Sequence, residues 1–194
     1  WRLARPVPEL RDALAPLPRF AVTLQVSKYR LFTWVAPPAN ADHQLTVFAR
    51  ADDLFFGALH SRLHEVWALR TGTRLETRPR YTPSTTFDTF PFPAGVLDGR
   101  DESPDRLALI VEAAKELNGL REGWLNPPEW TREEVLTFPG TVGGPWHRYI
   151  DQNTVEDRGA FKVGTVRYSR LVPRDDTSAA RLKKRTLTNL YNER

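Results

Sequence analysis

Hydrophobic and polar positions in the first part of the chain follow two different periods. Alternation with β-branched residues predicts three closely spaced strands and hence a meandering sheet, with strands over 20–26, 30–35 and 44–49. A short helix is predicted over 9–14, between prolines. From the capping carboxylates Asp52 and Asp53 to Gly72, apolar residues recur with the 3.6-residue period of a long helix.

This helical pattern gives way to a polar segment, 71–84, along which several arginines are spaced. A brief run over 85–93 follows and ends in prolines. A second helix is predicted from Ser103 to about Trp124, because one of its stripes is apolar for nearly three heptads. The stripe includes Leu107, Ile110, Ala114, Leu117 and Trp124.

The end of the chain reads as a mixture of short elements. Asn126-Pro127-Pro128 ends the second long helix. We expect a short helix over 129–136, a loop over 139–158, a strand within 160–172 and a basic helix from 177 onward. The fold class predicted is α+β: a small twisted, largely antiparallel sheet with a long packed helix, then a helical C-terminal region. We expect a core domain over 1–93 and a helical or loop region over 94–194 that packs on this core or on another domain.

Charge is distributed unevenly over a chain of 194 residues with a formal net charge of +4. Residues 1–93 carry 12 cations and 8 anions, 94–135 carry 5 and 10, and 136–194 carry 11 and 6. Arginine accounts for 23 of the 28 cations and suits bidentate contact with phosphate or guanine. A GC-rich coding bias explains the arginine excess equally well, so composition permits a nucleic-acid partner without demonstrating one.

Composition also excludes several classes of function. Cysteine is absent, which removes disulfides, thiolate metal sites and a cysteine nucleophile. No apolar run reaches the length of a membrane span, and there is no signal peptide, so we expect a cytoplasmic protein without membrane contact. Methionine is absent even from position 1, as expected of a piece excised from a longer chain.

Three motifs resemble catalytic or cofactor sites but lack part of the pattern. His60 and His64 have the spacing of a two-histidine metal site, yet Ser61 stands where the catalytic version has Glu. Asn126-Pro127-Pro128 resembles the adenine-methyltransferase loop, but Glu129 separates it from the aromatic Trp130. A cluster of glycines at 140–144 lacks the preceding strand of a nucleotide loop and is predicted to be a turn. We therefore expect no catalytic, cofactor or metal site here.

Basic and hydroxyl side chains remain as candidate site residues. Ser27-Lys28-Tyr29-Arg30 places cations and a hydroxyl at a strand junction, which is typical of a phosphate clamp. The Arg-rich segment 71–86 has the chemistry to read bases, because Arg pairs with guanine and Glu accepts from cytosine. A solvated connection between helix and strand is the alternative for this segment.

These residues together resemble the target-recognition region of large adenine-specific DNA methyltransferases, closest to the MmeI-like (type IIL) fused restriction–modification enzymes and related phage-defence methylases. The resemblance rests on VSKYRLFTW (26–34), HSRLHEVWALRTGTRLE (60–76), RYTPSTTFDTFPFP (80–93) and LKKRTLTNLYNER (182–194). The third of these segments also looks like the end of a recognition domain in type I specificity subunits.

The resemblance implies a domain that enters the major groove of duplex DNA and is followed by helices that pack on the methylase. It assigns base reading to Arg74, Glu76, Arg78 and Arg80. For phosphate contact, our candidates are Ser27, Lys28, Arg30 and Tyr81. It further implies that S-adenosylmethionine and the adenine-N6 chemistry belong to a methyltransferase domain N-terminal to this segment, which is its partner in the same polypeptide.

Two other functions stay open on the sequence alone. The apolar stripe of the second long helix, with acidic residues around it, favours a protein-interaction module that docks on the methylase or on another subunit. A self-contained hydrolase or metal enzyme is the third alternative.

Overall fold

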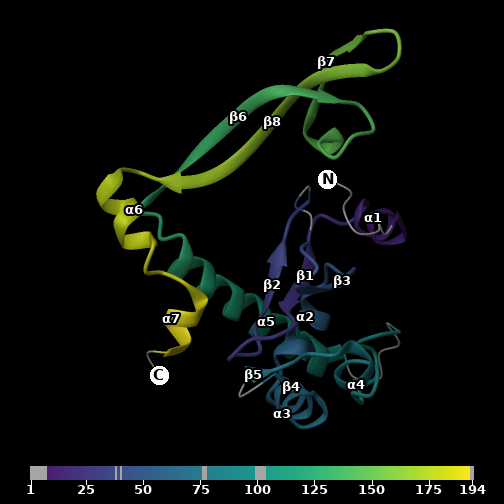
Figure 1. The fold of residues 1–194 in the computed structure, drawn as a ribbon, viewed down its shortest axis with the longest axis vertical. Coiled ribbons are helices and arrows are strands. Elements are labelled where there is room, and N and C mark those ends of the chain that lie inside the picture. Colours follow the sequence, from purple (N-terminus) through teal and green to yellow (C-terminus); the bar gives the residue numbers. More distant parts are fainter. Residues whose placement is uncertain (1–7, 38, 40, 76–77, 99–103, 193–194) are drawn as a thin grey trace. The chain divides into compact units, whose positions relative to one another are not determined.

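The computed structural model describes the chain except residues 1–7, 38, 40, 76–77, 99–103 and 193–194. It divides into two compact units, 1–118 and 119–194, and helix α5 (Pro104–Leu125) contributes to both. Figure 1 shows the elements of each unit. The mixed fold class and the antiparallel sheets are confirmed. The functional boundary between 93 and 94 stays a prediction.

The first unit is built on a three-stranded antiparallel sheet of order β2-β1-β3. Its strands are β1 (Phe20–Leu24), β2 (Phe32–Val35) and β3 (Leu45–Phe48), within the ranges predicted from the alternating pattern. Helix α1 (Pro8–Leu14) precedes them, also as predicted. Strand β1 lies in the middle of the sheet, paired with β2 on one side and β3 on the other. Its first four residues are buried, which explains why its sequence is mostly apolar.

Two helices follow the sheet where one long helix is predicted. Helix α2 (Asp53–His60) ends at Ser61, and α3 (Arg62–Thr71) begins there. Ser61 is extended and accepts a hydrogen bond from the His64 backbone N–H at 3.1 Å, so it caps the second helix. The prediction of a continuous helix was wrong at this residue, since a serine side chain competes well for backbone donors and favours a helix start.

An aromatic core joins the sheet to α2, α3 and α5 and to the residue that follows α4 (Pro83–Thr86). Its buried members include Phe32, Phe48, Phe55, Phe56 and Tyr81. Helix α5 approaches α2 closely at Gly57, where a Cβ atom added to the glycine would lie 2.6 Å from the Ile110 methyl carbon Cγ2. Glycine at this position therefore allows the two helices to pack against each other.

The second unit contains a long antiparallel ribbon rather than the predicted helix and loop. Strands β6 (Thr131–Thr141), β7 (Ile150–Asp157) and β8 (Lys162–Pro173) form a sheet of order β6-β8-β7 (green to yellow in Figure 1). The helix predicted over 129–136 and most of the loop over 139–158 were wrong. Charged residues with good helix propensity are drawn into β6 by cross-strand pairs, such as Glu134 with Arg170 at 2.6 Å.

Contacts among aromatic rings, and between arginines and the Trp130 ring, stabilise this unit. Edge-to-face contacts join four rings around the short 3₁₀ turn η1 (His147–Tyr149): Phe138, Trp146, Tyr149 and Tyr168.

The predicted basic C-terminal helix is two helices, α6 (Asp176–Leu182) and α7 (Leu187–Asn192). None of the helices that the structure describes is long and apolar enough to cross a membrane.

Candidate nucleic-acid interface

A small β-hairpin extends from the first unit between α3 and α4. Its strands are β4 (Arg74–Leu75) and β5 (Arg78–Pro79), with Arg74 opposite Pro79 and Leu75 opposite Arg78. Residues 76–77, which connect them, lie outside the described residues, and so does the candidate Glu76. Arg74 and Arg78 are exposed. The predicted polar loop is therefore in part a two-stranded ribbon that presents arginines to the solvent.

Backbone hydrogen bonds join this hairpin to the end of β1. The Ser27 N–H donates to the Pro79 carbonyl oxygen at 3.3 Å, and the Tyr81 N–H donates to the Gln25 carbonyl oxygen at 2.7 Å. Val26 and Arg80 form an antiparallel bridge between these two contacts. The hairpin is thereby fixed to the main sheet, although its own strands are only two residues long.

Arg30 anchors the same junction from inside the protein. Its Nη1 donates to the Thr23 hydroxyl at 3.1 Å and to the Leu24 carbonyl oxygen, and its Nη2 donates to the Pro79 carbonyl oxygen at 3.2 Å. The guanidinium lies 5.0 Å from the ring centroid of Tyr81. Burial lowers the pKa of Arg30 to about 10, which leaves it charged at neutral pH.

Tyr81 and His64 continue the anchor into the core. The His64 Nδ1 lies 2.9 Å from the Leu59 carbonyl oxygen, which only accepts, so Nδ1 carries the ring proton. Nε2 is then the acceptor for the Tyr81 hydroxyl at 3.2 Å. Burial lowers the pKa of His64 to about 4 and raises that of Tyr81. Both side chains are neutral at pH 7, as this hydrogen-bond pattern requires.

The structure separates the predicted site residues into two groups. Arg74, Arg78 and Arg80 are exposed on the hairpin, and Lys28 is exposed beside it, with Ser27 half-buried. Arg30 and Tyr81 are 9% and 1% exposed, and their polar atoms bond to other parts of the chain. We correct the role of these two residues from phosphate contact to positioning of the hairpin, because a buried group cannot reach a phosphate.

Strand geometry further divides the hairpin residues between two faces. Directly opposite residues in an antiparallel pair project to the same side, and successive residues alternate. Leu75, Arg78 and Arg80 therefore share one face, while Arg74 lies on the other with Pro79. Leu75 is 52% exposed and was not among the predicted site residues. A single leucine within an otherwise polar, Arg-rich segment is the sequence signal that could have pointed to it.

The motifs set aside as weak have structural roles. His60 Nδ1 lies 3.1 Å from the Phe56 carbonyl oxygen, and its Nε2 accepts from the Phe32 N–H at 3.2 Å. Among the described residues no three His, Cys, Asp or Glu side chains gather into a metal-binding group. Asn126-Pro127-Pro128 follows the end of α5, and the Pro127 carbonyl oxygen accepts from the Thr131 hydroxyl at 2.9 Å. A strand, β6, does precede the glycines, contrary to the prediction, and Gly140 lies within it; Gly143, with a φ of +83°, lies in the predicted turn after β6.

The comparisons with known proteins agree with the resemblance in the region of this hairpin. Residues 20–94 match the family model described as MmeI, target recognition domain. The matched segment begins with β1 and includes the hairpin and its buried anchor. No curated protein and no solved structure matches the chain. The match confirms an MmeI-like target-recognition region over this segment and supports a role in DNA sequence recognition within a restriction–modification methylase.

Proposed function

We propose that the β4–β5 hairpin reads base pairs in the major groove of duplex DNA. The observation that carries this proposal is a ribbon of exposed arginines fixed to a buried anchor within the matched segment. A two-stranded ribbon is narrow enough for the major groove, where arginine forms a bidentate pair with guanine O6 and N7. A rigid base lowers the entropy cost of placing such side chains against base edges.

The two faces of the hairpin assign different tasks to its residues. Arg78 and Arg80, together with Leu75, form one reading face, and the apolar Leu75 side chain suits contact with a thymine methyl group. Arg74 projects from the other face and reads a different base pair or the opposite strand. Glu76 belongs to the proposed base-reading set as an acceptor for cytosine.

Phosphate contacts come from the segment that supports the hairpin. Lys28 is exposed, and the backbone of Ser27 is bonded to Pro79 of β5, so both residues lie beside the reading ribbon. Contacts of this kind fix the register of a protein on DNA without reading sequence. Lys28 and the Ser27 hydroxyl are the residues that fill this role, in place of Arg30 and Tyr81.

The wider function that we propose is target-site recognition for an adenine-specific methylase in restriction–modification or phage defence. The chemistry would be methyl transfer from S-adenosylmethionine to adenine N6 after base flipping, carried out by a methyltransferase domain of the same polypeptide. The residues described here have no step in that transfer: they select and hold the duplex.

Duplex binding by charge-matched variants tests the proposal. Arg74→Ala/Arg78→Ala removes two hairpin cations, and Arg11→Ala/Arg106→Ala removes two exposed cations from α1 and α5. Fluorescence anisotropy on a labelled duplex at low salt should show a loss of about tenfold or more for the hairpin pair and a smaller loss for the control pair. Equal losses would mean that only overall charge matters and would contradict the proposal.

A further inference from the structure

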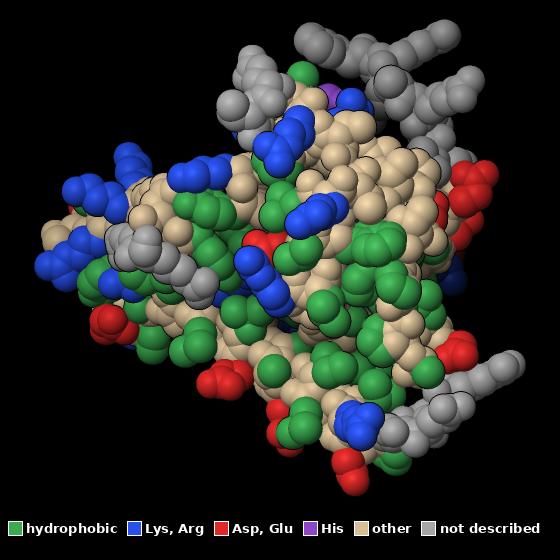
Figure 2. Space-filling view, turned by 90° about the horizontal axis from the view of Figure 1, so that it is seen from below, with side chains coloured by type: hydrophobic (Ala, Val, Ile, Leu, Met, Phe, Trp, Pro, Cys, Tyr) green, Lys and Arg blue, Asp and Glu red, His purple; other side chains and the backbone are tan. Residues whose placement is uncertain are grey.

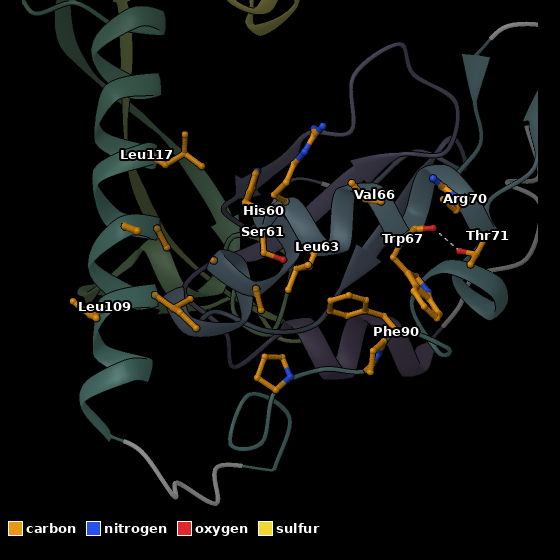
Figure 3. Close-up of a pocket in the computed structure, with 18 residues that line it drawn as sticks. His60, Ser61, Leu63, Val66, Trp67, Arg70, Thr71, Phe90, Leu109 and Leu117 are labelled. Carbon is orange, nitrogen blue, oxygen red and sulfur yellow. Dashed lines mark hydrogen bonds between the residues drawn. The ribbon is translucent and has the colours of Figure 1, made fainter.

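Helices α3 and α5 enclose a large apolar groove on the first unit. The cavity has a volume of about 970 Å³ and is lined by both helices, by the last residues of α2 and by Phe90, Pro91 and Pro93 (Figure 3). Three of its large aliphatic side chains are unusually exposed: Leu63 at 76%, Leu109 at 66% and Val66 at 39%. Hydrophobic side chains are also exposed over much of the face shown in Figure 2. Contiguous exposed apolar surface of this kind marks an interaction site.

The break at Ser61 explains why these side chains are not in the core. In a continuous helix, Leu63 and Val66 would continue the buried stripe of Phe55, Phe56 and Leu59. The extended conformation of Ser61 changes the direction of the chain before α3. The buried residues of α3 are therefore His64 and Ala68 instead. Leu63 and Val66 are then among the residues that line the groove, together with Leu109 and Leu117 of α5 (Figure 3).

The two rims of the groove carry opposite charges. Arg62 and Arg70 line it on α3, where Arg62 is ion-paired with Glu65 at 2.6 Å and Arg70 is exposed. On α5, helical geometry at 100° per residue places three exposed carboxylates just beyond the apolar row that faces the groove. These carboxylates are Asp105, Glu112 and Glu116, and they outnumber the one cation, Arg106, that the same geometry places on the groove-facing row. The groove thus has an apolar floor between one basic rim and one acidic rim.

We propose that this groove binds an amphipathic helix of a protein partner. The helix would place apolar anchors at positions i, i+3, i+4 and i+7 into the floor. Its acidic edge would lie along Arg62 and Arg70, and its basic edge along Glu112 and Glu116. Opposite charges on the two rims select a helix with one acidic and one basic edge. They also fix the direction in which the helix lies and its rotation about its own axis.

The chemistry of the lining excludes other occupants. Its uncharged hydroxyl side chains bond internally: Ser61 Oγ accepts from the His64 N–H, and the Thr71 hydroxyl donates to the Trp67 carbonyl oxygen at 2.9 Å. A small polar ligand would therefore find few convergent partners. Nucleic acid would meet the acidic rim of α5. The groove is separate from the β4–β5 hairpin, so this proposal stands or falls independently of the DNA-reading role.

Three synthetic helical peptides, each about 18 residues or five turns long, test the proposal on the intact chain. All carry the same leucine spacing; one has Glu facing the α3 rim and Lys facing the α5 rim, one has the two edges exchanged, and one has Gln at both. Anisotropy titration should show the tightest binding for the first peptide and about tenfold weaker binding for the exchanged one. Arg62→Glu/Arg70→Glu should reverse the preference between the two charged peptides.

Matched leucine variants locate the binding surface. Leu63→Asp should abolish peptide binding, whereas Leu97→Asp, at an exposed leucine outside the groove, should leave it unchanged. Both leucines are more than half exposed, so both variants should keep the wild-type unfolding midpoint. Failure of the charge-matched peptide to bind, equal binding of both edge patterns, or equal loss in the two variants would overturn the proposal. Sedimentation showing self-association that Leu63→Asp removes would assign the groove to a second copy of the chain and would also overturn it.

Discussion

Two groups of arginines meet at the β4–β5 hairpin and differ only in their surroundings. Arg30 lies beneath it, with its guanidinium bonded to Thr23, Leu24 and Pro79. Arg74 and Arg78 project from it into solvent. The same side chain thus stabilises the fold in one place and lies exposed at the surface in the other. Burial, rather than residue type, decides which arginines can contact DNA.

The largest effect is expected at the buried arginine. Arg30→Met should lower the free energy of unfolding by about 3–5 kcal/mol, because it leaves the Thr23 hydroxyl oxygen and the Leu24 carbonyl oxygen without their Arg30 donor and the Pro79 carbonyl oxygen with the Ser27 N–H alone. Urea unfolding of the chain measures this loss. Arg30→Lys should recover only part of it, since an ammonium lacks the planar fork that bridges Thr23 and Pro79. An unfolding curve for Arg30→Met like that of Arg78→Ala would remove the distinction between the two groups.

Acid should weaken the anchor through His64. Its pKa is about 4 in the folded chain and about 6.5 when unfolded, so the unfolded state binds the extra proton between these values. Stability from this residue is complete above pH 6.5 and declines as the pH falls toward 4, by on the order of 3 kcal/mol. Urea unfolding at pH 7 and at pH 4.5 should therefore differ more in the wild type than in His64→Gln. An equal pH dependence of both proteins would show that His64 is not buried as a neutral ring.

Substitution of an exposed hairpin arginine should weaken DNA binding and leave the stability of the fold nearly unchanged. Arg78→Ala should cost about 1–3 kcal/mol of binding free energy at one base position and leave the free energy of unfolding within about 0.5 kcal/mol. Competition between duplexes that differ at single base pairs measures the first quantity, and urea unfolding the second. Uniform weakening on every duplex would instead place Arg78 on the phosphate backbone.

The smallest effect is expected at Lys28. Lys28→Ala should reduce the slope of log affinity against log salt concentration by about 1 and leave base preference unchanged. Anisotropy titrations over a series of salt concentrations measure the slope. A change in base preference without a change in slope would move Lys28 from the phosphate group to the reading group.

The local pattern of the sequence was sufficient to predict the strands and the Arg-rich segment that this comparison involves. Alternation located β1, β2 and β3, and the break in helical periodicity located the Arg-rich segment that forms the hairpin. The fate of Arg30 was not predictable in the same way. Its burial depends on carbonyl oxygens supplied by Leu24 and by Pro79, and the contact with Pro79 exists only once the hairpin has docked on the sheet.

Long-range pairing also explains the errors in the second unit. The segment that forms β6 contains Arg132, Glu133 and Glu134, which favour a helix by propensity, and its strand state depends on β8 more than twenty residues later. The break at Ser61 was encoded more locally, as a capping residue within an otherwise periodic helix. Its consequence, the exposure of Leu63 in the groove, became visible only with α5 in place.

Selection of binding sites from a randomised duplex pool tests the central claim most directly. The wild-type chain, Arg74→Ala and Arg78→Ala would each be used to enrich bound duplexes, and the resulting base preferences compared position by position. Because the two arginines lie on opposite faces of the hairpin, each variant should lose preference at one or two positions, and the positions should differ. Base preferences identical to those of the wild type in both variants would contradict the assignment of this hairpin as the DNA-reading element.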